Sequence, residues 1–251
     1  MKIIFLGTNG WYDTETGNTT CILLEANDYY IILDAGNGLY KADKYIIKEN
    51  KPIYMFLSHF HLDHIAGLHV LNKFRYKQGL KIFGPRGTKN ILNTFINQPF
   101  TMPLNKLPYT VEVHELPREQ GLLPFSVDTK PLLHSSLTLG YRLELDGKII
   151  AYCPDTGYCD GAIELSKNAD LLIAECAYKT GQRNNNKWPH LNPETAARIA
   201  KESKVKMLAL IHFDANIYKT LEERKEAEKH AQGIFGNTFA AMDDMEFEIR
   251  G

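Results

Sequence analysis

The sequence changes character within one run, Pro52-Ile53-Tyr54-Met55-Phe56-Leu57-Ser58-His59-Phe60-His61-Leu62-Asp63-His64-Ile65-Ala66-Gly67. The first half is apolar and follows a proline, which predicts a short buried strand. The second half places three histidines and one aspartate within six positions. His59 and His61 are two residues apart, so in an extended chain their side chains point to the same side. This density of imidazole and carboxylate indicates a transition-metal site of the zinc, manganese or iron type, because a buried strand leaves few other ways to satisfy so many polar groups.

The composition is that of an ordinary soluble protein. The chain has 251 residues, of which 44% are hydrophobic and 24% charged, and a net charge of −1 gives no bulk attraction to nucleic acid or to an anionic membrane. Its four cysteines form no C-x-x-C pair, which favours free buried thiols in a reducing compartment. The apolar run at the N-terminus is too short for a signal peptide, and no apolar stretch reaches transmembrane length. We therefore expect a cytoplasmic protein without membrane contact.

Strands dominate the first half of the chain, and strands alternate with helices in the second. Helices that cover two packed sheets would form a four-layer αββα arrangement, and the chain is long enough for this as one domain. The predicted strands cover 2–6, 18–25, 29–33, 53–57, 80–83, 109–116, 125–133, 139–145, 148–152, 170–174, 206–211 and 244–249. The predicted helices cover 39–48, 65–78, 90–97, 162–167, 193–203 and 220–232.

Further polar candidates follow predicted strands, as the histidine run does. They are His134, Asp155, Glu175 and His212. A single histidine after an apolar run is more often a hydrogen-bonded core or surface residue than a ligand, but together with the run these residues indicate a site built where strands end. Asp34 is interpreted as a turn residue that accepts backbone N–H groups, and His69 as a histidine on a helix surface.

The His59-x-His61-x-Asp63-His64 run, followed in order by the downstream His, Asp and His, resembles the metallo-β-lactamase fold superfamily. Within it, the sequence is most similar to the ribonuclease Z-like and phosphodiesterase branch. The resemblance covers nearly the whole chain, because Gly7-Thr8 and Asp34-Ala35-Gly36 also match after their strands. It implies one hydrolase domain over residues 1–251 with the αββα sandwich fold.

The resemblance also implies a role for each ligand. Two divalent ions are expected, with zinc preferred and manganese or iron as alternatives. One ion would be bound by His59, His61 and His134, the other by Asp63, His64 and His212, and Asp155 would bridge them. Such a pair holds a hydroxide between the ions and clamps the charge that develops on the substrate. Asp63 would also orient that water or accept its proton.

Glu175 and His190 are a second candidate catalytic pair. In ribonuclease Z-like enzymes the Glu of a short His-Glu-Ala-Thr motif pairs with such a His, whereas this chain reads Ala174-Glu175-Cys176-Ala177, so only the Glu matches. A carboxylate beside an imidazole raises its pKa, and the imidazolium can then protonate a leaving oxygen. The alternative is that His190 only caps a loop.

The substrate is expected to be a small phosphodiester, such as a cyclic nucleotide or a short RNA end. Ribonuclease Z carries a long Gly/Pro-rich arm that grips tRNA; no such insertion is evident here, and the net charge is not basic. Arg183 and Lys187, in the polar loop before His190, are the candidate phosphate contacts, and a homodimer is compatible with the sequence.

Two other functions stay open. The first is hydrolysis of a carboxylic ester, lactone or thioester with the same metals, which has no need for the pair of Glu175 and His190. The second is a non-catalytic metal-binding regulator, for which loss of ligands is expected, and no ligand is lost here.

Overall fold

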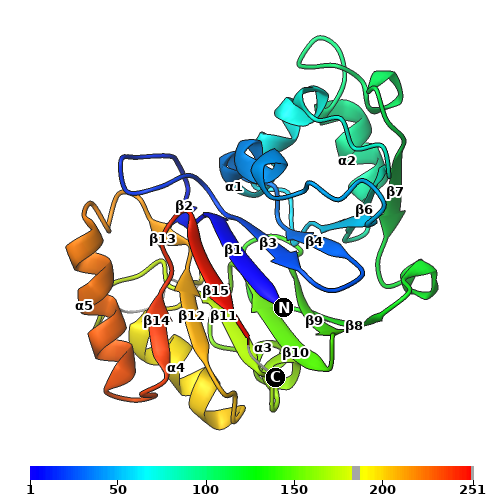
Figure 1. The fold of residues 1–251 in the computed structure, drawn as a ribbon. Coiled ribbons are helices and arrows are strands. Elements are labelled where there is room, and N and C mark those ends of the chain that lie inside the picture. Colours follow the sequence, from blue (N-terminus) through cyan, green and yellow to red (C-terminus); the bar gives the residue numbers. More distant parts are fainter. Residues whose placement is uncertain (183–186, 250–251) are drawn as a thin grey trace.

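The structure, a computed structural model that describes residues 1–182 and 187–249, contains two sheets packed face to face (Figure 1). Within these residues, one sheet has seven strands in the order β15 (Met245–Glu248), β1 (Lys2–Gly7), β3 (Cys21–Glu25), β4 (Tyr30–Leu33), β5 (Ile53–Phe56), β6 (Leu80–Gly84) and β7 (Val111–Glu115). The other has six, in the order β14 (Thr238–Ala240), β12 (Leu208–Ile211), β11 (Leu171–Glu175), β10 (Lys148–Cys153), β9 (Leu139–Leu145) and β8 (Ser126–Pro131). A short parallel pair, β2 (Asn9–Gly10) and β13 (Phe213–Asp214), links the segments that follow β1 and β12.

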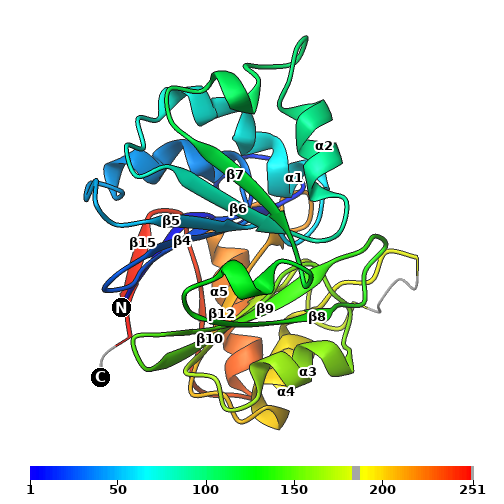
Figure 2. The same cartoon turned by 90° about the vertical axis from the view of Figure 1, so that its right-hand side faces the viewer.

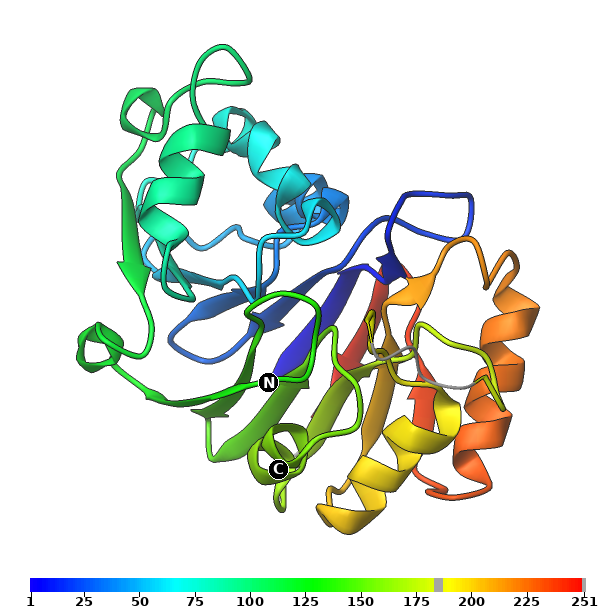
Figure 3. The ribbon, with the colours of Figure 1, turned by 180° about the vertical axis from the view of Figure 1, so that it is seen from behind.

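Helices cover the outer face of each sheet, which gives four layers (Figure 2). The seven-stranded sheet is covered by the 3₁₀ segment η1 (Asn37–Lys44), the short helix α1 (Leu62–Ile65), the 3₁₀ segment η2 (Ala66–Lys73) and α2 (Thr88–Phe95). The six-stranded sheet is covered by α3 (Asp160–Ser166), α4 (Pro193–Glu202) and α5 (Leu221–Gln232), and Figure 3 shows α4 and α5 side by side. Two single 3₁₀ turns, η3 (Leu104–Lys106) and η4 (Gln120–Leu122), lie in loops.

The central strands are buried on both faces, which explains why they read as continuous apolar runs. In β1, Ile3 and Phe5 pack between the sheets, while Ile4 and Leu6 pack against the helices outside. In β11, Ile173 likewise packs in the core between the sheets, while its neighbours in the strand pack against the helices outside. Each strand end is therefore held rigidly from two sides.

The αββα sandwich predicted from the sequence is confirmed. The predicted helices at 39–48 and 65–78 are largely 3₁₀ segments instead, and each contains a glycine on which a Cβ would overlap neighbouring main chain, Gly38 against Leu6 and Gly67 against Gly36. The strands β2, β13 and β14 were not predicted, because two or three residues are too few to show a period. The four cysteines are free thiols, as expected, and three of them are buried.

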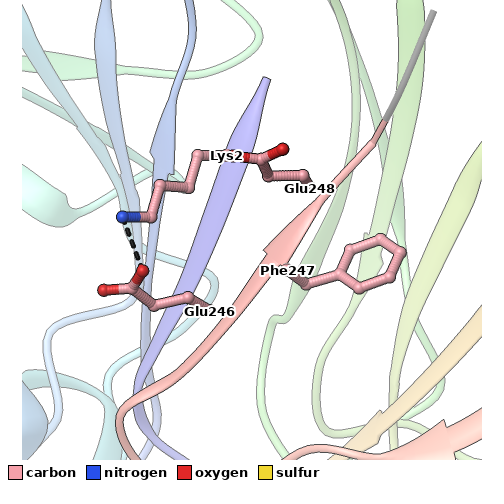
Figure 4. Close-up of a pocket in the computed structure, with 4 residues that line it drawn as sticks. All are labelled: Lys2, Glu246, Phe247 and Glu248. Atoms are coloured by element: carbon pink, nitrogen blue, oxygen red, sulfur yellow. Dashed lines mark ion pairs between the residues drawn. The ribbon is translucent and has the colours of Figure 1, made fainter.

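A pocket at the edge of the seven-stranded sheet lies between Lys2 and β15 (Figure 4). It is lined by Lys2, Glu246, Phe247 and Glu248, and Lys2 Nζ forms an ion pair with Glu246 at 2.6 Å. None of these residues belongs to a metal-ligating group found among the described residues. None of the helices in the described part of the chain has the length and apolar character that a bilayer span requires.

Candidate metal centre

The polar side chains predicted as ligands come together where strands of both sheets end. His59 and His61 lie on the link from β5 to α1, and the first turn of α1 carries Asp63 and His64. From the other sheet come His134 after β8, Asp155 after β10 and His212 after β12. Their ligand atoms form two groups within which the atoms lie no more than 4.8 Å apart, one of His59, His61, His134 and Asp155 and one of Asp63, His64 and His212. A third such group, of Asp155, His212 and His190, links the two. The fold therefore joins into one cluster seven residues that span 154 positions of the sequence, from 59 to 212.

Three imidazoles form the first part of the cluster. His61 Nδ1 lies 2.9 Å from His59 Nε2 and 3.3 Å from His134 Nε2. Burial lowers the pKa of His59 well below its usual value, lowers that of His61, and lowers that of His134 to about 4. These rings are therefore neutral near pH 7, which is the protonation state that binds a metal ion.

The second part combines carboxylates with imidazoles. His212 Nε2 lies 3.2 Å from Asp63 Oδ2 and 3.1 Å from Asp155 Oδ1, and His64 Nε2 lies 2.9 Å from the same Asp155 oxygen. Burial opposes charge on both rings, but the carboxylates outweigh it and raise the pKa of His64 and of His212. Burial likewise opposes ionisation of Asp155, yet His212 and His64 hold its pKa well below the usual range.

Asp155 lies between the two parts. Its Oδ2 is 3.9 Å from His59 Nε2 and 3.7 Å from His134 Nε2, whereas its Oδ1 faces His64 and His212. Among the described residues, His64 Nε2 and Asp155 Oδ1 are buried atoms that make no hydrogen bond, although they lie close together. Buried polar atoms are normally satisfied, so lone pairs that converge without hydrogen bonds fit a site for cations.

Asp34 supports the cluster from behind, a role that the sequence interpretation missed. It was expected to accept backbone N–H groups within its turn. Instead, its Oδ1 accepts the N–H of Ser58, two residues after the neighbouring strand β5, at 2.7 Å. Its Oδ2 meets the Ser58 hydroxyl at 2.7 Å, the Tyr152 hydroxyl at 2.6 Å and His64 Nδ1 at 2.8 Å. The ring of His59 is supported in the same way by Ser58, whose Oγ lies 3.0 Å from His59 Nδ1. These contacts at Nδ1 leave Nε2 of each ring to face the cluster.

We predict that Asp34→Asn destabilises the protein by about 3 kcal/mol, because one oxygen that accepts buried donors becomes an NH₂ group. The measurement is urea unfolding of metal-free protein. Asp128→Asn, on the exposed face of β8, is the matched control and should change the free energy of unfolding by less than about 0.5 kcal/mol. Equal stability of the two variants would contradict the supporting role of Asp34.

His212 depends on a close approach of main chain. It has a positive φ of 53°, which is uncommon for a residue with a side chain, and such strain is often found at functional sites. A Cβ on Gly10 would lie 2.5 Å from the His212 ring. The unpredicted pair of β2 and β13 is therefore what brings the glycine and the histidine together.

Glu175 and His190 form the predicted pair, despite the departure from the family motif. His190 Nδ1 lies 2.8 Å from Glu175 Oε1, and the same oxygen accepts the N–H of Thr156 at 2.5 Å. The other oxygen accepts the N–H of Ala177 at 3.2 Å, so the carboxylate is fixed. Burial lowers the pKa of His190, but Glu175 outweighs this and raises it to about 9. The His190 ring lies 5.9 Å from that of His212, at the edge of the cluster.

The remaining predicted residues lie outside this arrangement or cannot be placed. Arg183 lies outside the described residues, and Lys187 is exposed on the segment before His190. His69 is exposed on η2, and its Nδ1 lies 2.7 Å from the Ala66 carbonyl. Trp188, which the sequence did not single out, stacks on His61 with ring centroids 5.1 Å apart. A single tryptophan in a polar loop carries no periodic signal that would have drawn attention to it.

Known proteins share this sequence and fold. The family described as the β-lactamase superfamily domain matches residues 29–213. Ribonuclease Z of Bacillus velezensis is 27% identical over 312 residues, an alignment that covers 99% of both chains. The metallo-β-lactamase fold protein YhfI of Bacillus subtilis is 24% identical, with 98% of both chains covered and a TM-score of 0.80. The short form of human tRNase Z is 23% identical, with 100% of both chains covered and a TM-score of 0.76.

The family match extends over most of the chain, from β4 to β13, and includes all seven clustered residues. It confirms the resemblance to the metallo-β-lactamase fold that the histidine run predicted. Divalent metal ions are the cofactors that this family implies, and the donors described above suit them. The chain therefore belongs to the family of the β-lactamase superfamily domain.

Proposed function

We propose that this metal-dependent hydrolase is a phosphodiesterase that uses two divalent ions, zinc in the first place. The observation that carries the proposal is the buried pair of His190 and Glu175 beside the cluster. Hydrolysis of a thioester or an activated ester needs no such acid, because its leaving group is stable as an anion, whereas an alkoxide leaving from phosphorus needs a proton. The curated relative named ribonuclease Z, aligned over the whole chain, supports the same choice.

The proposed ligand assignment follows the two parts of the cluster. His59, His61 and His134 would hold one ion, and the second would be held by Asp63, His64 and His212. Asp155 would contribute to both, because each of its oxygens faces one part. When bound, two such ions activate water and offset the negative charge that develops on a phosphodiester.

The protein's own residues complete the proposed chemistry. Asp63 Oδ2 accepts the backbone N–H of Trp11 at 2.8 Å, which fixes a carboxylate that can orient an attacking water. His190 would donate a proton to the departing oxygen, and Glu175 holds the His190 ring in place through Nδ1. Lys187 stays a proposed phosphate contact, together with Arg183.

We further propose that the substrate is small or is the end of an RNA chain. The alignment to the Bacillus velezensis enzyme is 312 residues long, more than the 251 residues of this chain, while it covers 99% of both. The relative therefore carries internal segments that this chain lacks, which fits the missing tRNA-gripping arm. A cytoplasmic location and a homodimer stay predictions.

The metal count is the first test. Protein loaded with Zn²⁺ and then desalted should retain about two ions per chain. Elemental analysis checks this number, with protein treated with a chelator as the blank. A value below about one ion per chain would rule out the two-metal proposal.

The reaction class is tested by comparing three substrates at equal concentration. A bis-aryl phosphodiester should be turned over faster than a lactone or a thioester, because two metal ions offset the negative charge of a phosphodiester. His190→Ala should impair most the hydrolysis of a phosphodiester that expels an alkoxide, because that leaving group needs a proton. Preferred turnover of the lactone or thioester would instead assign the protein to carboxylic ester chemistry, and absence of turnover with every substrate and metal would favour a regulator.

A further inference from the structure

Trp188 presents an accessible indole directly on the candidate centre. Its ring is parallel to that of His61, with centroids 5.1 Å apart and an interplanar angle of 11°, and it meets His134 edge-on at 5.6 Å. Its carbonyl accepts the Tyr178 hydroxyl at 2.7 Å, which anchors the main chain at this point. Yet 47% of the residue remains exposed. One side of the indole therefore contacts the rings of His61 and His134, and much of its remaining surface is exposed to solvent.

Trp188 exposes a large apolar ring directly beside a cluster of polar side chains. Large exposed aromatic side chains beside a polar site typically mark a contact surface. A fixed indole is a good stacking partner for a nucleobase, because every base has a π-face and little side-chain entropy is lost. If Trp188 only shielded His61 from water, its replacement would affect all substrates alike.

The position of Trp188 relative to His190 matches the layout of a nucleotide. The two residues are separated by one position, and their rings flank His134, which lies 5.6 Å from Trp188 and 5.2 Å from His190. A phosphate that meets His190 would thus place an attached nucleoside next to the indole. Trp11, the only other tryptophan of the chain, meets the cluster through its backbone N–H, while its ring packs on Tyr12.

We propose that Trp188 is a stacking platform for a nucleobase, so the substrate is a nucleotidyl phosphodiester with the base next to the phosphate that is cleaved. The inference rests on the proposed phosphodiesterase function and narrows its substrate class. Trp188 is then a specificity-determining residue for binding of the base and takes no part in bond cleavage.

Steady-state kinetics with a matched pair of substrates tests the platform. Thymidine 5′-(4-nitrophenyl phosphate) and methyl 4-nitrophenyl phosphate release the same 4-nitrophenolate and differ in the nucleoside. Trp188→Leu should raise KM for the thymidine ester about tenfold and leave kcat unchanged, since stacking is lost equally in ground and transition states. KM for the methyl ester should change less than about twofold, and Trp188→Phe should keep most of the base preference.

Phe100→Leu is the control variant, because Phe100 is an exposed ring that lines a separate apolar pocket with Ile91 and Phe95. It should leave the ratio of the two KM values as in the natural protein. If Trp188→Leu raised KM equally for both esters, or for neither, the proposal that Trp188 stacks on a base would be wrong.

Fluorescence gives a readout that does not depend on turnover. In Trp11→Phe protein loaded with Zn²⁺, Trp188 is the only indole. Thymidine 5′-phosphate should quench its emission, whereas ribose 5-phosphate should not. Equal quenching by both compounds, or quenching by neither, would contradict stacking. If no phosphodiester is hydrolysed, the proposed function fails, and the quenching difference still decides whether Trp188 stacks on a base.

Discussion

Replacing Asp155 with alanine is expected to lower kcat/KM for a phosphodiester by at least about 10³-fold, because it removes the one group that serves both proposed ions. The structure gives the reason. Asp155 is 3% exposed, its Oδ2 faces His59 and His134, and its Oδ1 faces His64 and His212. Loss of this carboxylate leaves the two metal sites uncoupled and the buried positive charge uncompensated.

Two measurements separate this effect from simple unfolding. The bound metal per chain should fall from about two to about one or fewer, while circular dichroism should show that the αββα fold persists. Asp34→Asn, which removes only the support behind His64, should weaken metal affinity about 10- to 100-fold and keep measurable activity. If Asp155→Ala retained two ions and activity within tenfold of the natural protein, the bridging role would be wrong.

The elements of the centre that the sequence predicted all have a local signal. The histidine run follows an apolar strand, and each later ligand follows another predicted strand, so the end of the strand is visible in the sequence next to the residue that it positions. Glu175 also follows an apolar strand, but its pair with His190 was predicted from the resemblance to ribonuclease Z-like enzymes, although Ala174, Cys176 and Ala177 depart from the family motif. The pairing depends on the position of Glu175 at the end of β11, where its carboxylate reaches His190, and the other residues of the motif are not required for this contact.

The features that were missed depend on contacts between distant segments. Asp34 also follows an apolar strand, but its bond to His64 arises only because β4 and β5 are adjacent and parallel. Likewise, the close approach of Gly10 to His212 needs the pairing of β2 with β13, more than 200 residues apart in the sequence. Neither contact has a pattern that a single segment can carry. Supporting residues of a centre are therefore harder to predict than its ligands.

Replacing His190 with alanine should impair substrates according to the oxygen that leaves. For a dinucleotide, whose ribose alkoxide needs a proton, kcat/KM should fall by about 10²- to 10⁴-fold. For a 4-nitrophenyl ester of the same nucleotide the fall should be much smaller, because 4-nitrophenolate leaves without protonation. His69→Ala, an exposed histidine on η2, is the control and should change neither rate. Equal losses on both leaving groups would show that His190 has only a structural role.

The pH profile tests the same group independently. Burial lowers the pKa of His190, but Glu175 raises it to about 9, so the imidazolium is present at lower pH and is lost as the pH rises through this value. Bound metal ions disfavour the positively charged form of His190, so the metal-loaded enzyme should lose the imidazolium at or below this pH. Dinucleotide hydrolysis should therefore fall on the alkaline side. Glu175→Gln should shift this loss of activity to lower pH, because it removes the negative charge that keeps His190 protonated. His190→Ala should abolish the loss of activity at high pH. If the loss of activity at high pH is unchanged in both variants, it belongs to another group, and His190 is not the acid.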